Sequence, residues 1–415
     1  MNSSRSLPRR QFLQQAARLT AFSATVPAFL QRSTAAMAGN STAPLPGLND
    51  NRVLVLVQMA GGNDGLNTLV PHANDLYYQA RPSLAIARES TLKITDEVGF
   101  PSDAPDLRRM FDDGNLSIVQ NVGYPNPDLS HFRSTEIWET AARSDENLAT
   151  GWVGRYFDRE CSDVRSPILG LQFGERSAAT FAGRTPRGVT LANPQLLSWN
   201  ESTAVTNGMQ RLNRVETTSN TALDFLQRTG NDALAVSRQI GAALKDRPSA
   251  VDYPRFQFSQ TLKLVAQMIA AEVPTRVFYV SLGGFDTHAA QKRRHLALLQ
   301  EFSEGLAAFH RDLRETGHLD RTLVMTFSEF GRRVAENKSL GTDHGTANVL
   351  FLTGGKAKPG LHGPMADLSR LTPDGDLIHQ IDFRSVYAAV LRDWLGAAPG
   401  DLLGSGIAPL EGILG

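Results

Sequence analysis

Cysteine is almost absent from this sequence, and neither sign of charge is in excess. The chain has 415 residues and one cysteine, Cys161, which excludes an internal disulfide framework and a cysteine-built zinc site. Any metal ion must therefore be held by Asp, Glu and His. Lysine plus arginine and aspartate plus glutamate number 42 each, so the formal net charge is zero. Because nucleic-acid binding normally requires a basic excess, we expect no nucleic-acid partner.

Long apolar runs are also scarce, and the main one lies near the N-terminus. Arg9 and Arg10 precede a moderately apolar stretch at 19–30, and Ala-Met-Ala at 36–38 fits a signal-peptidase site. This order predicts a twin-arginine signal peptide over residues 1–38, read by the twin-arginine export machinery, and a periplasmic or secreted mature protein. An amphipathic N-terminal helix is the alternative. No later run is long enough to cross a bilayer, so we expect no membrane span in the mature protein.

Beyond a Pro/Gly/Asn-rich linker at 39–51, the chain alternates strand-like and helix-like segments. Helical periodicity marks residues 258–271 and 291–316. Apolar runs of strand length occur at RVLVLVQMA (52–60), LSIVQNV (116–122), RVFYVSL (276–282) and RTLVMTF (321–327). The alternation predicts one α/β domain over 52–415, with a mostly parallel central sheet and helices on both faces.

The stretch from about 147 to 254 departs from this alternation. Part of it is rich in Asn, Ser and Thr, and we interpret it as an irregular insertion or cap beside the sheet. Such a segment can carry substrate selection, or it can serve only as packing material.

Polar residues suited to metal binding or nucleophilic attack follow the ends of the expected strands. In open α/β sheets, ligands bind beyond the carboxyl ends of the strands, so these residues are candidates for one site. They are Asn63 and Asp64 in GGNDGLN, Ser130 before an expected helix at 131–142, Asp286 and His288 in GGFDTH, Glu329 and Arg332 in SEFGRR, and Asp343 and His344 in GTDHG.

Each motif also has a purely structural explanation. In chain order, these are an Asn-Asp-Gly turn, a serine N-cap, a hydrogen-bonded loop histidine, a glutamate–arginine salt bridge and a polar turn before a strand. A carboxylate on a glycine turn is equally a good ligand for a hard metal ion. A serine at a helix N-terminus beside a metal ion is equally a possible nucleophile. The recurrence of such residues at strand ends favours a metal site.

The order of these motifs resembles the alkaline phosphatase-like superfamily, which includes alkaline phosphatases and sulfatases. More closely, GGNDGLNTLVPH, NPDLSHFRSTEIWE, GGFDTHAAQ, and SEFGRR followed by GTDHG resemble the DUF1501 family of exported bacterial proteins of unknown function. The resemblance implies an alkaline phosphatase-like three-layer sandwich. It also implies an exported, metal-dependent hydrolase of phosphate or sulfate esters, with a small anionic ester as substrate.

The resemblance further implies one or two divalent metal ions. A mixed nitrogen and oxygen set suits zinc or manganese, whereas a set made mainly of oxygens suits magnesium, calcium or manganese. The two sets are Asp286, His288 and His344 for the first ion, and Asp64, Glu329 and Ser130 for the second.

Ser130 is the nucleophile that the resemblance implies, and Arg332 or Asn63 would hold a nonbridging oxygen. Phe330 stands where the superfamily has a histidine. The metal site of this chain is therefore either functional or degraded. Asp343 is a ligand, a partner that orients the adjacent histidine, or a turn residue. The alternative function is a non-catalytic exported binding or assembly protein of the same fold. A serine hydrolase is disfavoured because no Gly-x-Ser-x-Gly elbow surrounds Ser130.

Overall fold

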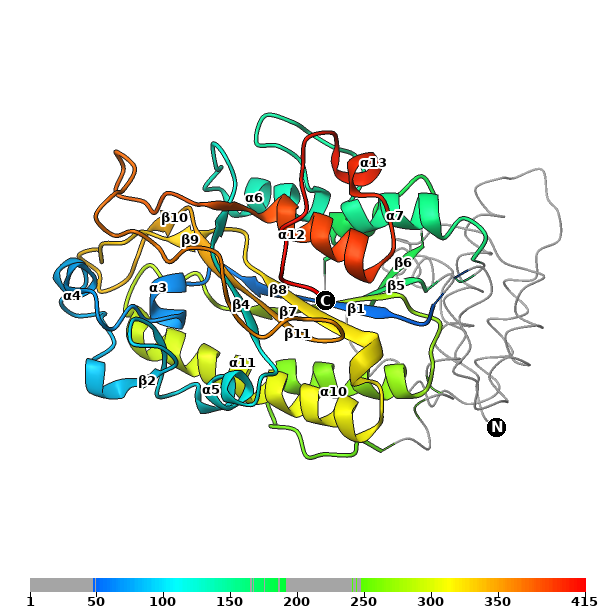
Figure 1. Ribbon diagram of the computed structural model, residues 1–415, viewed down its shortest axis with the longest axis horizontal. Helices are drawn as coiled ribbons and strands as arrows, with labels where there is room; N and C mark the ends of the chain where they lie inside the picture. The colour runs from blue at the N-terminus through cyan, green and yellow to red at the C-terminus, as the bar shows by residue number, and fades with distance from the viewer. Residues whose placement is uncertain are drawn as a thin grey trace, which may run out of the picture.

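A nine-stranded sheet forms the centre of the protein (Figure 1). The computed structural model describes residue 48, residues 50–191 except 165, 167, 175 and 186, residues 241 and 244, and residues 248–415. The strand order is β12-β4-β11-β8-β1-β7-β5-β6, and β13 also pairs with β4. The strands are β1 (Val53–Ala60), β4 (Ser117–Gly123), β5 (Gly170–Phe173), β6 (Gly188–Leu191), β7 (Val277–Gly283), β8 (Thr322–Phe327), β11 (Asn348–Gly354), β12 (Gly360–His362) and β13 (Ile381–Asp382).

The sheet is mostly parallel, and β11 is its antiparallel strand. β1 lies between β7 and β8 and is parallel to both, whereas β11 runs antiparallel to β4 and β8. Alternate residues of β1 enter different cores: Val55 and Val57 pack on one face, Leu54 and Leu56 on the other. Because both faces of this strand are covered, its sequence is a continuous apolar run.

Helices cover both faces of the sheet, so the expected α/β fold class with its three layers is confirmed (Figure 1). One face carries α5 (Pro105–Asp112), α10 (Gln257–Ala270) and α11 (Gln291–Glu315). The other carries α6 (His131–Thr140), α7 (Trp152–Glu160), α12 (Phe383–Ala389) with the π-helical turn η5 (Val390–Trp394), and α13 (Pro399–Leu403).

Shorter elements complete the described chain. They are α3 (Gly65–Thr68), α4 (Asp75–Ala80), the strand pairs β2 (Thr91–Lys93) with β3 (Gly99–Pro101) and β9 (Gly331–Arg332) with β10 (His344–Gly345), and the 3₁₀ turns η1 (Arg88–Ser90), η2 (Ala179–Phe181) and η4 (Leu319–Arg321). The carboxyl ends of the parallel strands β1, β4, β7 and β8 share one edge of the sheet, and the antiparallel β11 begins there. The loops at this edge carry the candidate residues.

The interval 147–254, predicted to be an insertion or cap, is described mainly up to residue 191. This part adds α7 and the strands β5 and β6, which extend the central sheet in parallel beyond β7. Strands of only four residues leave little periodicity in a sequence. This explains why the sequence analysis interpreted the segment as irregular. Residues 192–240, the predicted signal peptide at 1–38 and most of the linker at 39–51 lie outside the described residues. None of the helices within the described ranges is long and apolar enough to cross a membrane.

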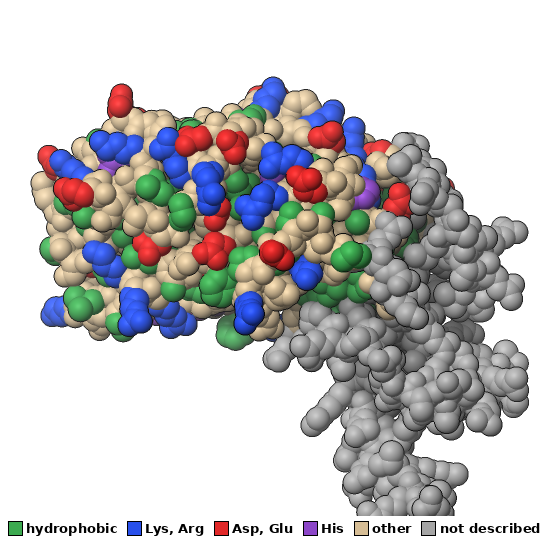
Figure 2. Space-filling view, turned by 90° about the horizontal axis from the view of Figure 1, so that it is seen from below, with side chains coloured by type: hydrophobic (Ala, Val, Ile, Leu, Met, Phe, Trp, Pro, Cys, Tyr) green, Lys and Arg blue, Asp and Glu red, His purple; other side chains and the backbone are tan. Residues whose placement is uncertain are grey.

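The face that carries α10 and α11 has a mixed surface. Figure 2 views it from below Figure 1, and basic and acidic side chains are interspersed there, with apolar side chains between them.

Trp138 joins α6 to the sheet and to α12. Its buried ring stacks on Phe383 and Phe327, with ring centroids 4.2 and 5.7 Å away. We expect Trp138→Ala to lower the free energy of unfolding by about 3–5 kcal/mol, because it removes both contacts and leaves a cavity. Phe132→Ala, on the same helix, is the matched control: this ring is 72% exposed, so we expect a change within about 0.5 kcal/mol. Urea denaturation measures both, and equal losses would contradict this packing.

Candidate metal centre

Three histidines and one aspartate meet at the carboxyl edge of the sheet. His131 opens α6, Asp286 and His288 follow β7, and His344 opens β10. The Nε2 atoms of His131, His288 and His344 lie 3.4, 3.0 and 3.3 Å from Oδ1 of Asp286. Nε2 of His288 is also 2.9 Å from Nε2 of His344. One nitrogen from each ring therefore lies close to the same carboxylate oxygen.

Glu329 holds the ring of His131. Its buried carboxylate lies 2.9 Å from Nδ1 of His131 and accepts a hydrogen bond from the amide of Gly61 at 2.8 Å. Because a carboxylate accepts hydrogen bonds, Nδ1 of His131 carries the proton. In the neutral ring, Nε2 then has no proton, and its lone pair is directed at Asp286. This Nε2 atom is buried and has no hydrogen-bond partner among the described residues. The hydrogen bond to Glu329 raises the pKa of His131.

The other two histidines are held in the same way. Nδ1 of His344 donates to the carbonyl oxygen of Leu129 at 2.7 Å, and Nδ1 of His288 lies 3.4 Å from Oδ1 of Asp343. Asn337 donates to the same Asp343 oxygen at 3.0 Å, and this hydrogen bond lowers the pKa of Asp343. Burial lowers the pKa of His344. Asp343 therefore lies against His288, whereas the sequence suggested His344 as the histidine it orients.

Arg332 fixes the carboxylate of Asp286. The guanidinium is buried and donates to Oδ1 of Asp286 at 2.9 Å. Burial acts to raise the pKa of Asp286, but hydrogen bonds from Arg332 and His344 outweigh it and bring this pKa to about 2. The remaining hydrogen bonds of the guanidinium go to the carbonyl oxygens of Gly61, Gly62, Phe285 and Thr342. These contacts make Arg332 a scaffold, and its role as a clamp for a substrate oxygen stays a prediction.

Phe330 packs against two of the histidines. Its buried ring has centroid distances of 4.9 Å to His131 and 4.4 Å to His344. Gly62, with a φ of +75°, permits this approach, because a Cβ there would overlap the Phe330 ring. The residue that stands in place of a superfamily histidine thus positions two other imidazoles.

Asp64 lies in a buried ion pair apart from these histidines. It is the N-cap of α3, and its Oδ1 accepts from the amide of Asn67 at 3.3 Å. Its Oδ2 accepts from Arg81 at 2.7 Å and from Gln291 at 2.5 Å. Burial acts to raise the pKa of Asp64, but the charge of Arg81 outweighs it, so this pKa is lowered. The role of Asp64 as a metal ligand stays a prediction, and Arg81 already supplies a positive charge there.

Ser130 and Asn63 have contrasting environments. Ser130 is the exposed N-cap of α6, directly before His131, and its side chain makes no capping hydrogen bond within the described chain. Asn63 is fully buried, and its amide group is hydrogen-bonded to Thr68 and Asn348. Of the two, Ser130 therefore has the side chain that is open to a ligand.

His131 is the residue that the sequence reasoning missed. The ligand atoms of His131, Asp286 and His344 all lie within 4.8 Å of one another. The available signal was its place directly after Ser130, at the first position of the expected helix. With His288, whose Nε2 is 3.0 Å from the same Asp286 oxygen, the cluster offers three imidazole nitrogens and one carboxylate oxygen, which are donor types that zinc prefers. Because lone pairs and a negative oxygen repel each other, either protons or a cation must lie between them.

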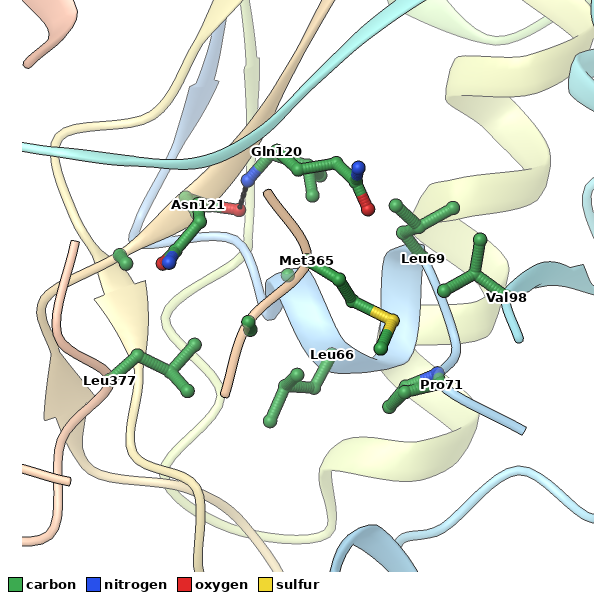
Figure 3. Close-up of a pocket in the computed structure, with 13 residues that line it drawn as sticks. Leu66, Leu69, Pro71, Val98, Gln120, Asn121, Met365 and Leu377 are labelled. Carbon is green, nitrogen blue, oxygen red and sulfur yellow. Dashed lines mark hydrogen bonds between the residues drawn. The ribbon is translucent and has the colours of Figure 1, made fainter. Parts of the chain in front are cut away.

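A hollow beside α3 is separate from this cluster (Figure 3). Apolar side chains line most of it, among them Leu66, Leu69, Val98 and Met365, with the carboxamides of Gln120 and Asn121 at its edge. No histidine, aspartate or arginine belongs to its lining within the described residues. It therefore offers no charge to an anionic ester.

The fold and the cluster define an α/β protein with a candidate metal centre at the carboxyl edge of its sheet. A profile of the family described as "Protein of unknown function (DUF1501)" matches residues 116–383. The chain belongs to this family, as the sequence resemblance predicted. No curated protein matches the chain.

Solved structures similar to the chain include a sulfatase, a lipoteichoic acid synthase and an alkaline phosphatase. The sulfatase PsFucS1 from Pseudoalteromonas sp. is 10% identical, with 99% of this chain and 77% of that chain covered and a TM-score of 0.38. The lipoteichoic acid synthase LtaP from Listeria monocytogenes is 7% identical, with 91% and 79% covered and a TM-score of 0.37. The alkaline phosphatase from the Antarctic bacterium TAB5 is 12% identical, with 73% and 92% covered and a TM-score of 0.34. Similarity of this degree does not assign an activity to the chain.

The Arg81–Asp64 pair provides a test of stability. Arg81→Met leaves the buried carboxylate of Asp64 unpaired, so we expect a loss of about 3–5 kcal/mol in the free energy of unfolding. The double variant Arg81→Met/Asp64→Asn should recover part of this loss, because it removes the uncompensated charge while the carbonyl oxygens of Arg333 and Val334 still lack their donor. Urea denaturation with and without added zinc or magnesium measures both variants. Rescue of Arg81→Met by either ion would instead identify Asp64 as a metal ligand.

Proposed function

We propose that His131, Asp286, His288 and His344 hold one divalent metal ion, and that zinc is the ion their donor atoms favour. The supporting observation is the convergence of three Nε2 atoms on Oδ1 of Asp286, at 3.0 to 3.4 Å. The buried Nε2 of His131 is consistent with this proposal, because it forms no hydrogen bond within the described residues and has the Asp286 oxygen 3.4 Å away.

In this proposal, Glu329, Asp343 and the carbonyl of Leu129 orient the three imidazoles. Each accepts from an Nδ1–H group, which fixes the tautomer and turns Nε2 toward the ion. Glu329 and Asp343 thus act on ligands and are not ligands themselves. When bound, a zinc ion supplies Lewis acidity that stabilises negative charge on an ester oxygen or an attacking hydroxyl.

We propose further that the centre hydrolyses phosphate or sulfate esters, with Ser130 as nucleophile. The hydroxyl of Ser130 is exposed, does not cap α6, and is one residue from His131. The first amides of α6 favour an anion at the same place. Ser130 would form the bond to phosphorus or sulfur as the alcohol leaves, and water would then release the acid and restore the hydroxyl.

One ion per chain is the stoichiometry we propose. The carboxylate predicted for a second ion, Asp64, already accepts from Arg81 and Gln291, and its pKa is lowered by the arginine charge after burial has acted to raise it. A guanidinium thus takes the place that a second cation would need.

The second candidate is a non-catalytic exported binding or assembly protein with a single structural metal ion. The contacts of Arg332 favour it, because this buried guanidinium is committed to Asp286 and to backbone carbonyls and does not face a substrate. In both cases we propose export by the twin-arginine route to the periplasm or beyond. The predicted signal at 1–38 lies outside the described residues.

Metal analysis tests the proposed centre. We expect purified wild type to bind one zinc ion per chain, and His131→Ala and His344→Ala to lose this stoichiometric binding. Glu329→Gln should weaken zinc binding by about 10- to 100-fold, because it removes the charge that orients His131. His362→Ala is the control, since His362 lies on β12 and contacts the carbonyl of Lys358. Elemental analysis and chelator competition provide the measurements. Unchanged zinc affinity in His131→Ala would overturn the ligand set.

Turnover tests the role of Ser130. We expect the zinc-loaded wild type to hydrolyse 4-nitrophenyl phosphate or 4-nitrophenyl sulfate, and Ser130→Ala to bind zinc normally while it loses at least about 100-fold in kcat. Retained activity in Ser130→Ala would exclude this nucleophile. A wild type that binds zinc but turns over neither ester favours the binding or assembly function.

A further inference from the structure

Phe132 is an exposed aromatic residue next in sequence to a proposed metal ligand, His131. It directly follows His131 on α6, and it is 72% exposed, more than any other large hydrophobic side chain in the described ranges. Single exposed apolar side chains are common on protein surfaces and need no explanation by themselves. The position of this one, next to a proposed metal ligand, makes its surroundings informative.

Arg176 lies over this ring. Its guanidinium carbon is 5.1 Å from the centroid of Phe132, which is a cation–π distance, and the arginine side chain is exposed. Its charge also reaches Glu139, on the same helix as Phe132. Burial raises the pKa of Glu139 to about 6, and the positive charge of Arg176 opposes part of this rise. An aromatic face and a positive charge are therefore presented together.

The segment that carries Arg176 is fastened to α6. The carbonyl oxygen of Arg176 accepts from the side chain of Gln172 at 2.8 Å, and the same side chain accepts from the amide of Ala178 at 2.7 Å. The amide of Ala179 donates to the carboxylate of Glu139 at 2.7 Å. Through these bonds the segment between β5 and η2 is held against the helix that provides His131. Arg176 is thus anchored at its backbone while its guanidinium stays exposed.

We propose that Phe132 and Arg176 form a subsite that selects esters whose organic part combines a flat ring with a second negative charge. The inference rests on the proposed hydrolase function and adds a substrate class to it. The ring of the substrate would pack on the face or edge of Phe132 that Arg176 leaves uncovered, and its anionic group would pair with the planar donors of Arg176. Phe132 directly follows the proposed ligand His131 on α6, and adjacent helical side chains point about 100° apart, so the subsite would lie to one side of the centre.

Binding of inert phosphonates tests the subsite without requiring turnover. Isothermal titration of the zinc-loaded full chain compares phenylphosphonate with 4-carboxyphenylphosphonate. We expect wild type to bind the carboxylated compound about fivefold more tightly, because one exposed ion pair contributes up to about 1 kcal/mol of binding free energy. Arg176→Ala should abolish this preference and change the Kd of phenylphosphonate by less than about twofold. Phe132→Ala should weaken both ligands, because each loses its stacking surface.

Arg143→Ala is the matched control. Arg143 is an exposed arginine just beyond α6 that pairs with Asp145, so its removal changes the net charge equally without touching Phe132. It should retain the preference of wild type. A preference that survives in Arg176→Ala, or that falls equally in Arg143→Ala, overturns the subsite and leaves the proposed function intact. Failure of wild type to bind either phosphonate overturns both.

Discussion

The buried guanidinium of Arg332 holds together the loops on which the candidate centre depends. It donates to the glycine turn after β1, to Phe285 and Asp286 after β7, and to Thr342 before β10. Its own strand, β9, pairs with β10, so that Arg332 lies opposite His344. Only a planar group with five donors can satisfy so many acceptors in one place, and a lysine could not replace it. The position of Asp286 relative to His344 therefore follows from the arginine before any ligand arrives.

The fold was predictable because its signals are local. The run RVLVLVQMA identified β1, and the alternation of such runs with helical periodicity indicated a mostly parallel sheet covered on both faces. The strands β5 and β6 were not recognised, because four residues without regular alternation are not distinguishable from a loop. Their assignment to the sheet depends on pairing with β7, a tertiary contact that no local pattern encodes.

The site was predictable only in part, for a related reason. Acids and histidines on glycine turns identified Asp286, His288 and His344, which the structure brings together. The partners of other site residues come from other parts of the sequence. Glu329 contacts His131 from 198 positions away, and Arg81 contacts Asp64 from 17 positions away. Whether a carboxylate orients a histidine, pairs with an arginine or binds a metal ion depends on such contacts. A motif identifies the residue type at a site, and the tertiary neighbour decides what that residue does.

In the proposed function, the charges of the candidate centre link the metal ion to the substrate. Asp286, Glu329 and Asp343 contribute one negative charge each and Arg332 one positive charge, which leaves an excess of two negative charges when the imidazoles are neutral. Such a site repels an anionic ester, and the exposed positive charge of Arg176 is screened by water and salt. A divalent cation cancels this excess and gives the ester oxygen a positive neighbour. If the proposed function holds, the metal ion is required for binding the anion as well as for chemistry on it, so a metal-free chain of this sequence should retain its fold and lose its affinity for anions.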